Sequence, residues 1–183
     1  MSFDYESAFH LGGKWAKKVA ERLNNSGVEC YAPEIQIAKT AAERNFMTKH
    51  EQDIVFPWCD ATIEVKSSTR NFTDLVEGYP YDSLFVDTVS GYDGKAVTPL
   101  AYAIISQEQE GIVCIAPSSY ATWTKVKAYD KHRKIYETFY SAPKESLIRF
   151  SVLVDYLKNY SDNDFINRIL GIDDGIPISI EEL

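Results

Sequence analysis

The sequence predicts a mixed α/β fold of the α+β type, in which helices pack against a mixed β-sheet. The prediction starts from two helical patterns, because apolar residues recur at helical spacing in residues 4–24 and again in 144–160. Between them lie short segments rich in β-branched and aromatic residues, as is typical of strands. These segments are residues 28–31, 53–56, 61–66, 84–89, 100–106 and 112–116.

The composition is that of one globular domain. The 183 residues are 45% hydrophobic and 25% charged, and no segment approaches the roughly 18 consecutive apolar residues of a membrane helix. No signal-peptide pattern opens the sequence, and the three widely spaced cysteines favour neither a disulfide framework nor a zinc site. We therefore expect a cytoplasmic protein without a membrane partner.

The net charge of −8 argues against a nucleic-acid partner, but the charge is unevenly distributed. Residues 155–183 contain seven acids and two bases, whereas residues 125–134 contain five bases and one acid. The basic segment is either a patch that faces phosphates or the outer face of a helix. The composition therefore leaves nucleic-acid binding open.

The helix predicted for residues 4–24 ends at Asn24–Gly27, a helix-stop sequence. After the strand at 28–31 comes a basic connector, residues 39–50. Thr40 and Glu43 in it have capping-box spacing, which permits a short helix. Lys49, immediately before the next strand, is a candidate contact for substrate phosphates.

Residues 53–66, DIVFPWCDATIEVK, predict a β-hairpin. The turn falls at residues 57–60, because proline lacks a ladder donor and aspartate favours turns. If Phe56 pairs with Ala61 across this turn, the pairing register follows for the whole hairpin.

This register places Asp53 directly opposite Glu64, with Cβ atoms about 5 Å apart. Lys66 lies one pleat beyond on the same face. Two opposed carboxylates repel each other, and a hard divalent cation such as Mg²⁺ would offset the repulsion through their oxygens. The face is therefore either a metal site with an adjacent lysine or a solvated edge of the hairpin.

The chain beyond the hairpin begins with a polar, irregular stretch that has one helical turn near residues 73–77. Ser67, Ser68 and Arg70 leave the hairpin beside the acids, so they are candidates for phosphate contacts. The strands at 84–89, 100–106 and 112–116 form a meander that we expect to extend the same sheet, largely antiparallel, with a turn at 90–95.

The C-terminal third is predicted to be mainly helical. Ser118 and Ser119 are good caps for a helix over residues 118–127, which carries Lys125 and Lys127 as candidate phosphate contacts. The aromatic residues nearby either stack nucleobases or, as we favour, pack. A strong helix at 144–160 and a short one ending at Leu170 complete the chain. We divide it into a core, residues 1–140, and a helical extension with an acidic tail, residues 141–183, packed on the same domain.

Several well-known motifs are absent from the sequence. It contains no GxGxxG, no GxxxxGK[ST], no HExxH and no GxSxG. The sequence therefore gives no support for a nucleotide-binding loop, a zinc protease or an α/β-hydrolase.

The order of helix, strand and hairpin, with Asp53 followed by Glu64-Val65-Lys66, resembles the PD-(D/E)XK nuclease superfamily. The similarity covers residues 4–116 and is closest to Holliday-junction-resolvase-like and phage nucleases. It implies a restriction-endonuclease-like αβββαβ core, here with a helical C-terminal extension. The chain departs from the pattern in Gln52, which stands where proline is common. It also lacks a clear helix after the third strand of the pattern. The helix predicted at 118–127 would take the place of that helix.

The resemblance implies that Asp53 and Glu64 bind Mg²⁺ or Mn²⁺, with the backbone carbonyl of Val65 as a further ligand. Lys66 would orient or help deprotonate the attacking water and stabilise charge on the phosphate. The glutamate that many members carry on the first helix has no residue in register here, and Glu6 is the candidate for that ligand.

The resemblance further implies a metal-dependent nuclease that hydrolyses DNA in phage or bacterial recombination, repair or genome processing. Its partner would be DNA, and it would be located in the cytoplasm of a bacterial or phage-infected cell. The resemblance is also compatible with a homodimer. One alternative is a catalytically silent nuclease-fold protein that binds nucleic acid or a protein partner. Another is an unrelated α+β binding domain in which Asp53, Glu64 and Lys66 form a solvated ladder.

Overall fold

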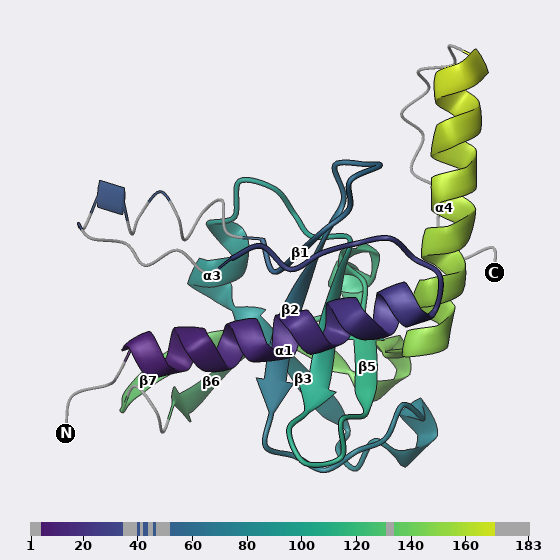
Figure 1. Cartoon of the computed structure of the whole chain (residues 1–183). Coiled ribbons are helices and arrows are strands. Elements are labelled where there is room, and N and C mark those ends of the chain that lie inside the picture. Colours follow the sequence, from purple (N-terminus) through teal and green to yellow (C-terminus); the bar gives the residue numbers. More distant parts are fainter. Residues whose placement is uncertain are drawn as a thin grey trace.

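The computed structural model describes residues 5–34, 40, 42, 43, 46, 52–130 and 134–170. For residues 5–12 and 161–170, the outer ends of the first and last helices, it describes the backbone and not the side chains. The described residues form two β-sheets and two long helices (Figure 1). The predicted class, mixed α/β with a mixed sheet, is confirmed.

The central sheet has five strands in the order β1-β2-β4-β5-β8. β2 and β4 are parallel and the other neighbours are antiparallel. The strands are β1 (Ile54–Val55), β2 (Thr62–Ser68), β4 (Ala101–Ser106), β5 (Ile112–Ile115) and β8 (Ile148–Arg149).

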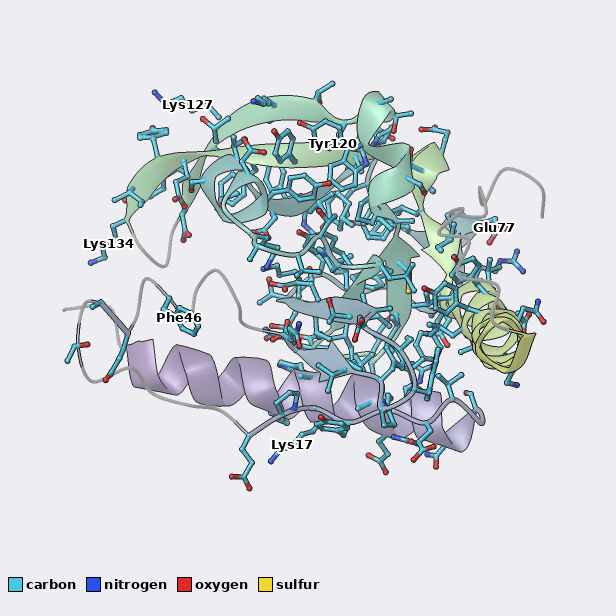
Figure 2. All side chains as sticks on the ribbon, turned by 90° about the horizontal axis from the view of Figure 1, so that it is seen from above. Lys17, Phe46, Glu77, Tyr120, Lys127 and Lys134 are labelled. Carbon is cyan, nitrogen blue, oxygen red and sulfur yellow. The ribbon has the colours of Figure 1, made fainter. Side chains whose placement is uncertain are left out.

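The second sheet has three antiparallel strands in the order β3-β7-β6. Viewed from above, α1, the central sheet and the second sheet form three successive layers (Figure 2). The strands are β3 (Ser83–Thr88), β6 (Thr124–Asp130) and β7 (Ile135–Pro143). The helices are α1 (Tyr5–Asn25), α3 (Val89–Asp93) and α4 (Phe150–Leu170), with 3₁₀ turns at Val76–Gly78, Pro117–Thr122 and Lys144–Ser146.

The central sheet separates two hydrophobic cores. Ile63 and Val65 of β2 pack with α1 and α4, as do the alternate residues of β4 and β5. The opposite face of β4, with Tyr102 and Ile104, packs against the second sheet. Because side chains alternate along a strand, Glu64 and Lys66 lie on the face that is directed toward the second sheet.

The helix predicted for residues 4–24 is confirmed as α1. Its apolar stripe is buried against the sheet, while Lys14 and Lys17 are exposed. Gly27 ends it with a φ of 87°, a conformation that glycine adopts without a steric penalty. The buried stripe within the described side chains is Trp15, Ala16, Val19, Ala20 and Leu23.

The hairpin register predicted from residues 53–66 is confirmed. Ile54 pairs with Ile63 and Val55 pairs with Thr62, as the pairing of Phe56 with Ala61 requires. The predicted strand at 28–31 is reduced to an isolated bridge between Tyr31 and Val55.

A side chain accounts for the missing strand at 28–31. Asn24 accepts a hydrogen bond from Cys30 N (3.2 Å) and donates one to Cys30 O (2.9 Å). The backbone groups of Cys30 are thus already satisfied by the end of α1 and do not join a ladder.

Two predictions about the middle of the chain are wrong. The strand at 84–89 exists as β3, but it pairs with β7 in the second sheet and does not extend the first. The helix predicted for 118–127 is a 3₁₀ turn followed by β6. The cause is pairing with β7, which places Val126 opposite Phe139 and Tyr129 opposite Tyr136, and such aromatic pairs stabilise strands.

The C-terminal helix also differs from its prediction. It begins at Phe150 rather than at 144, because residues 148–149 pair with β5 as β8, and it runs on through Leu170 without the predicted break. The proposed division at residue 140 falls inside β7, and α4 contributes Leu153 and Leu157 to the core that it shares with α1.

Three short predicted features are present in the structure. The capping box is present, since Thr40 N donates to Glu43 and Glu43 N donates to Thr40 Oγ1. The helical turn predicted near 73–77 is the 3₁₀ turn at Val76–Gly78, and the predicted turn at 90–95 is largely the short helix α3. Among the described helices, none is both long and apolar enough to traverse a bilayer.

Candidate functional site

Four charged side chains meet on the β2 face that is directed toward the second sheet. Lys66 Nζ lies 2.8 Å from Glu64 Oε1 and 3.5 Å from Asp87 Oδ1 of β3. Lys95, in the loop after α3, lies 2.9 Å from Glu64 Oε2. We refer to Glu64, Lys66, Asp87 and Lys95 as the β2 charge cluster.

The β2 charge cluster is mostly withdrawn from solvent. The side chains of Glu64, Asp87 and Lys95 are 13%, 10% and 11% exposed, whereas Lys66 is 35% exposed. Ion pairs at such low exposure are weakly screened by salt, and removal of one partner leaves an uncompensated charge. Lys66 is therefore the member that a bound ligand reaches most easily.

Asp87 is held in place by its neighbours. It accepts hydrogen bonds from Thr88 N (2.8 Å) and from the Tyr102 hydroxyl of β4 (3.3 Å). A Cβ on Gly91 would lie 3.0 Å from Asp87 Oδ1 and 2.7 Å from Thr88 Oγ1, the N-cap of α3. Glycine at position 91 is thus needed for this close approach of α3 to the carboxylate.

Asp53 reaches β2 from the start of the hairpin. Its Oδ2 accepts a hydrogen bond of 2.7 Å from Val65 N, between Glu64 and Lys66 in the chain. Asp53 also contributes to the electrostatic environment of Lys66. The structure therefore brings together the three residues that the sequence analysis named as catalytic.

The charges of the cluster stabilise one another. Burial raises the pKa of Glu64, but Lys66 and Lys95 outweigh it and hold that pKa below its usual value. Burial likewise lowers the pKa of Lys66, and Glu64 and Asp87 together raise it above its usual value. Burial and the nearby Asp87 carboxylate raise the pKa of Tyr102. These shifts favour the carboxylate form of Glu64, the ammonium form of Lys66 and the neutral, hydrogen-bond-donating form of Tyr102.

The donor set available to a metal ion is limited to two carboxylates. Within residues 52–130 and the other described parts of the chain, no three His, Cys, Asp or Glu side chains are grouped so that they could hold a metal. Mg²⁺ is commonly bound through only one or two carboxylates and completes its shell with water and substrate phosphates. Asp53 and Glu64 fit that requirement in type, although both oxygens of Glu64 accept hydrogen bonds from lysines.

None of the protein-family models, curated proteins and solved structures compared with this chain matches it. The likeness to PD-(D/E)XK nucleases therefore rests on the residues of the hairpin and on the order of the elements. What the β2 charge cluster does has to be inferred from its own contacts and chemistry.

The serines and the arginine that follow the hairpin are not all at the cluster. Ser67 alternates to the α1 side of β2, where it accepts a hydrogen bond of 3.0 Å from Gln107. Ser68 is on the cluster side, two residues beyond Lys66, and accepts from Arg70 N (3.2 Å). The guanidinium of Arg70 lies 3.8 Å from the centre of the Tyr81 ring.

The remaining predicted site residues lie elsewhere. Lys125 and Lys127 are exposed on β6 of the second sheet, not on a helix. Glu6 belongs to α1, but its side chain is outside the described part of the structure, and Lys49 is outside the described residues altogether.

Sequence analysis missed Asp87, Lys95 and Tyr102. Asp87 is the one acid in the strand LFVDTV, and an acid inside an apolar strand was an available signal. Lys95 and Tyr102 had no comparable signal, because they reach Glu64 and Asp87 through pairings between distant segments.

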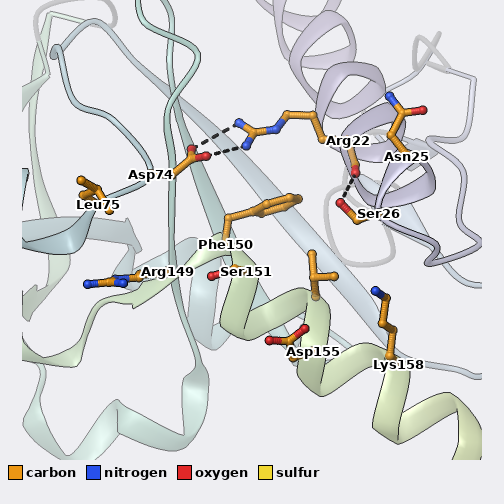
Figure 3. Close-up of a pocket in the computed structure, with 11 residues that line it drawn as sticks. Arg22, Asn25, Ser26, Asp74, Leu75, Arg149, Phe150, Ser151, Asp155 and Lys158 are labelled. Carbon is orange, nitrogen blue, oxygen red and sulfur yellow. Dashed lines mark hydrogen bonds and ion pairs between the residues drawn. The ribbon is translucent and has the colours of Figure 1, made fainter.

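A second group of charges lines a pocket of about 620 Å³ between the end of α1, the loop at 74–75 and the start of α4 (Figure 3). Arg22 makes two hydrogen bonds to Asp74, of 3.3 and 2.6 Å, and Asp74 also accepts from Ile112 N at 2.7 Å. Arg22 lies over the Phe150 ring at 4.8 Å. These contacts join α1 to a loop, a strand and α4, which is a structural role.

Proposed function

We propose that the protein is a metal-dependent nuclease that hydrolyses DNA phosphodiester bonds, with Asp53, Glu64 and Lys66 as its catalytic residues. The main support is the hydrogen bond from Val65 N to Asp53 Oδ2, because it brings the first acid against the strand that carries the second acid and the lysine. A solvated ladder at a hairpin edge would not require this contact, nor the low exposure of Glu64.

The order of the elements agrees with the proposal. After α1, the antiparallel β1–β2 hairpin is followed by a crossover to β4, which lies parallel to β2. α1 packs on the face of β2 opposite the cluster. The crossover, described throughout from residue 69 to 100, contains β3 and the five-residue α3 where the αβββαβ pattern has a longer helix.

Mg²⁺ or Mn²⁺ would be held by the carboxylates of Asp53 and Glu64 and the carbonyl of Val65. When bound, such an ion makes a coordinated water more acidic and neutralises charge on the phosphate. Glu64 shares its two oxygens between Lys66 and Lys95, so Lys95 has to release Oε2 for Glu64 to serve as a ligand. Lys95 is the suitable group to leave, because it comes from a loop whereas Lys66 is part of β2.

Of the two roles open to Lys66, charge stabilisation is the one we propose. In the metal-free protein Glu64 and Asp87 raise the pKa of Lys66, which favours its protonated form. A protonated amine next to the bound phosphate donates a hydrogen bond and stabilises the charge that develops in the transition state. Asp87 and Glu64 together fix the direction of that amine.

The test is cleavage of linear, circular, single-stranded and branched DNA with Mg²⁺, with Mn²⁺ and with chelator. We expect cleavage that chelator abolishes and that Lys66→Ala lowers by about 10²–10³-fold, as for the loss of one preorganised donor. Lys17→Ala, on the exposed side of α1, is the matched control and should cleave like the wild type. Cleavage that persists in chelator, or that Lys66→Ala leaves unchanged, contradicts the proposal.

A second candidate is a catalytically silent protein of the same architecture that binds nucleic acid or a protein partner. It is favoured by one observation, that two lysines already neutralise Glu64. Calorimetric titration with Mg²⁺ separates the two candidates. Binding by the wild type that is lost in Glu64→Gln supports the nuclease, whereas DNA binding without Mg²⁺ binding and without cleavage supports the silent protein. Sedimentation with and without DNA tests whether either form is a homodimer.

A further inference from the structure

The two faces of the β6–β7 ribbon differ in their side chains. The pairs Lys125–Tyr140, Lys127–Thr138 and Tyr129–Tyr136 share one face, because directly paired residues point to the same side of a sheet. We call it the inner face, since Tyr140 is part of the core between the two sheets. The outer face carries Thr124, Val126, Ala128 and Asp130 with Ser141, Phe139, Glu137 and Ile135.

Side-chain contacts agree with this assignment. Lys125 Nζ lies 5.2 Å from the centre of the Tyr140 ring and Lys127 Nζ 5.8 Å from that of Tyr136. The rings of Tyr129 and Tyr136 are 5.1 Å apart. Lysine and tyrosine therefore alternate along one continuous surface.

Charge is segregated between the two faces. Both acids of the paired strands, Asp130 and Glu137, are on the outer face, whereas Lys125 and Lys127 are on the inner face. Among the described residues of the ribbon, the inner face thus carries positive charge alone. Such a surface complements a polyanion in spite of the protein's overall charge of −8.

The inner face becomes exposed toward the tip of the ribbon. Tyr140 is 3% exposed, whereas Tyr129 and Tyr136 are 48% and 69% exposed. The ribbon extends beyond the central sheet on the same side as the N-terminal half of α1, with Lys127 and Lys134 near its end (Figure 2). Packing thus explains Tyr140 but not Tyr129 and Tyr136 near the tip, whose rings are available to a ligand.

The inner face is continuous with the β2 charge cluster. Asp87 of β3 pairs directly with Tyr140 and so lies on the same face of the second sheet. Its carboxylate is 3.5 Å from Lys66 Nζ. Tyr140, which lies between Asp87 and the exposed tip, is only 3% exposed, so the open part of the inner face ends before the cluster.

We propose that the exposed part of the inner face of the β6–β7 ribbon binds single-stranded DNA. Bases stack on Tyr129 and Tyr136, and phosphates contact Lys125 and Lys127. A single strand is the favoured ligand because its bases have free faces for stacking on aromatic side chains. This binding does not depend on the proposed nuclease function.

The experiment is fluorescence anisotropy with a labelled oligothymidylate, in chelator and at low salt, so that cleavage plays no part. Stacking of one base on an aromatic ring contributes about 1–3 kcal/mol to the free energy of binding. We therefore expect Tyr136→Ala, and likewise Tyr129→Ala, to weaken binding about tenfold. Tyr136→Phe keeps the ring and should bind like the wild type, which separates stacking from folding. Lys127→Ala should weaken binding and reduce its dependence on salt.

The matched control is on the other face of the same ribbon. Ile135→Ala removes an exposed apolar side chain beside Tyr136 and should leave the affinity unchanged. Equal losses in Ile135→Ala and Tyr136→Ala overturn the proposal. So does unchanged affinity in both tyrosine variants, tighter binding of the corresponding duplex, or dissociation of a dimer by Tyr136→Ala in sedimentation.

The binding proposal and the nuclease proposal can fail separately. If the tyrosine variants lose binding and the wild type does not cleave DNA in Mg²⁺, the binding proposal stands and the nuclease proposal is rejected. If the wild type cleaves DNA and the tyrosine variants bind it as the wild type does, the nuclease proposal stands and the binding proposal is rejected.

Discussion

The β2 charge cluster and the Arg22–Asp74 pair both join distant segments through ionised side chains, yet they are built differently. In the pair, one guanidinium meets one carboxylate, with exposures of 30% and 45%. In the cluster, Glu64 receives two amines, and its side chain and that of Lys95 are only 13% and 11% exposed.

This difference bears on function. A structural role is sufficient to explain Arg22 and Asp74. Arg22 joins α1 to the loop at residue 74 and to the turn before β5, and Asp74 joins that loop to β5. Burying ionised groups is costly, and apolar residues of similar volume often stabilise a fold as well or better. Groups of charged residues with shifted pKa values are common where chemistry takes place, which supports a functional reading of the β2 charge cluster.

The largest difference between the two regions should appear when one carboxylate is removed from each. Glu64→Ala leaves two amines without their shared anion, so we expect a loss of about 3 kcal/mol in the free energy of unfolding. Asp74→Ala breaks a partly exposed pair and one backbone hydrogen bond, with an expected loss of about 1–2 kcal/mol. Denaturant unfolding of both variants measures the difference, and equal losses would show that burial does not distinguish the regions.

A smaller effect tests whether packing fixes the geometry of the cluster. Gly91→Ala should destabilise the protein by about 1–2 kcal/mol, since its Cβ would lie 2.7 Å from Thr88 Oγ1 and 3.0 Å from Asp87 Oδ1. Gly78→Ala is the control in the same crossover, because its nearest neighbour would be 3.9 Å away. If the two variants have the same thermal midpoint, α3 can shift to accommodate the added Cβ at little cost, and its packing does not fix the position of Asp87.

The smallest expected effect is a difference in pH dependence, measured in chelator. The pKa of Glu64 is lower in the folded state than in the unfolded state, so its contribution is present above the unfolded pKa and is lost as pH falls through the folded one. One such group changes the stability by at most about 1.4 kcal/mol per pH unit. Unfolding at several pH values between neutral and acid should therefore show a shallower decline for Glu64→Gln than for the wild type. The same slope in both proteins would exclude Glu64 as the source.

Much of the fold was predictable where neighbouring residues decide it. α1 follows from its own apolar stripe and terminating glycine, and the hairpin register follows from Pro57 and the alternation around it. The pairing of β4 with β5 across a short polar turn belongs to the same class. In each case the partners lie close in the chain, so that few alternatives compete.

Two other predictions failed for different reasons. β3 pairs with β7, about 50 residues later in the chain, instead of joining the central sheet, and this is long-range pairing. Residues 124–130 pair with the next strand in the chain, so the prediction of a helix there missed a local hairpin. Secondary structure in such segments depends on which edge is available in three dimensions, and local propensity does not report it.

The candidate site divides in the same way. The sequence by itself determined the hairpin register, and with it that Glu64 and Lys66 share one face, because a two-residue period and one turn are local properties. Only the tertiary structure decided that Asp87, Lys95 and Tyr102 meet Glu64 and Lys66. The physical reason is that these residues are brought together by the packing of two sheets, and the burial of their apolar faces selects that arrangement from many that the local sequence allows.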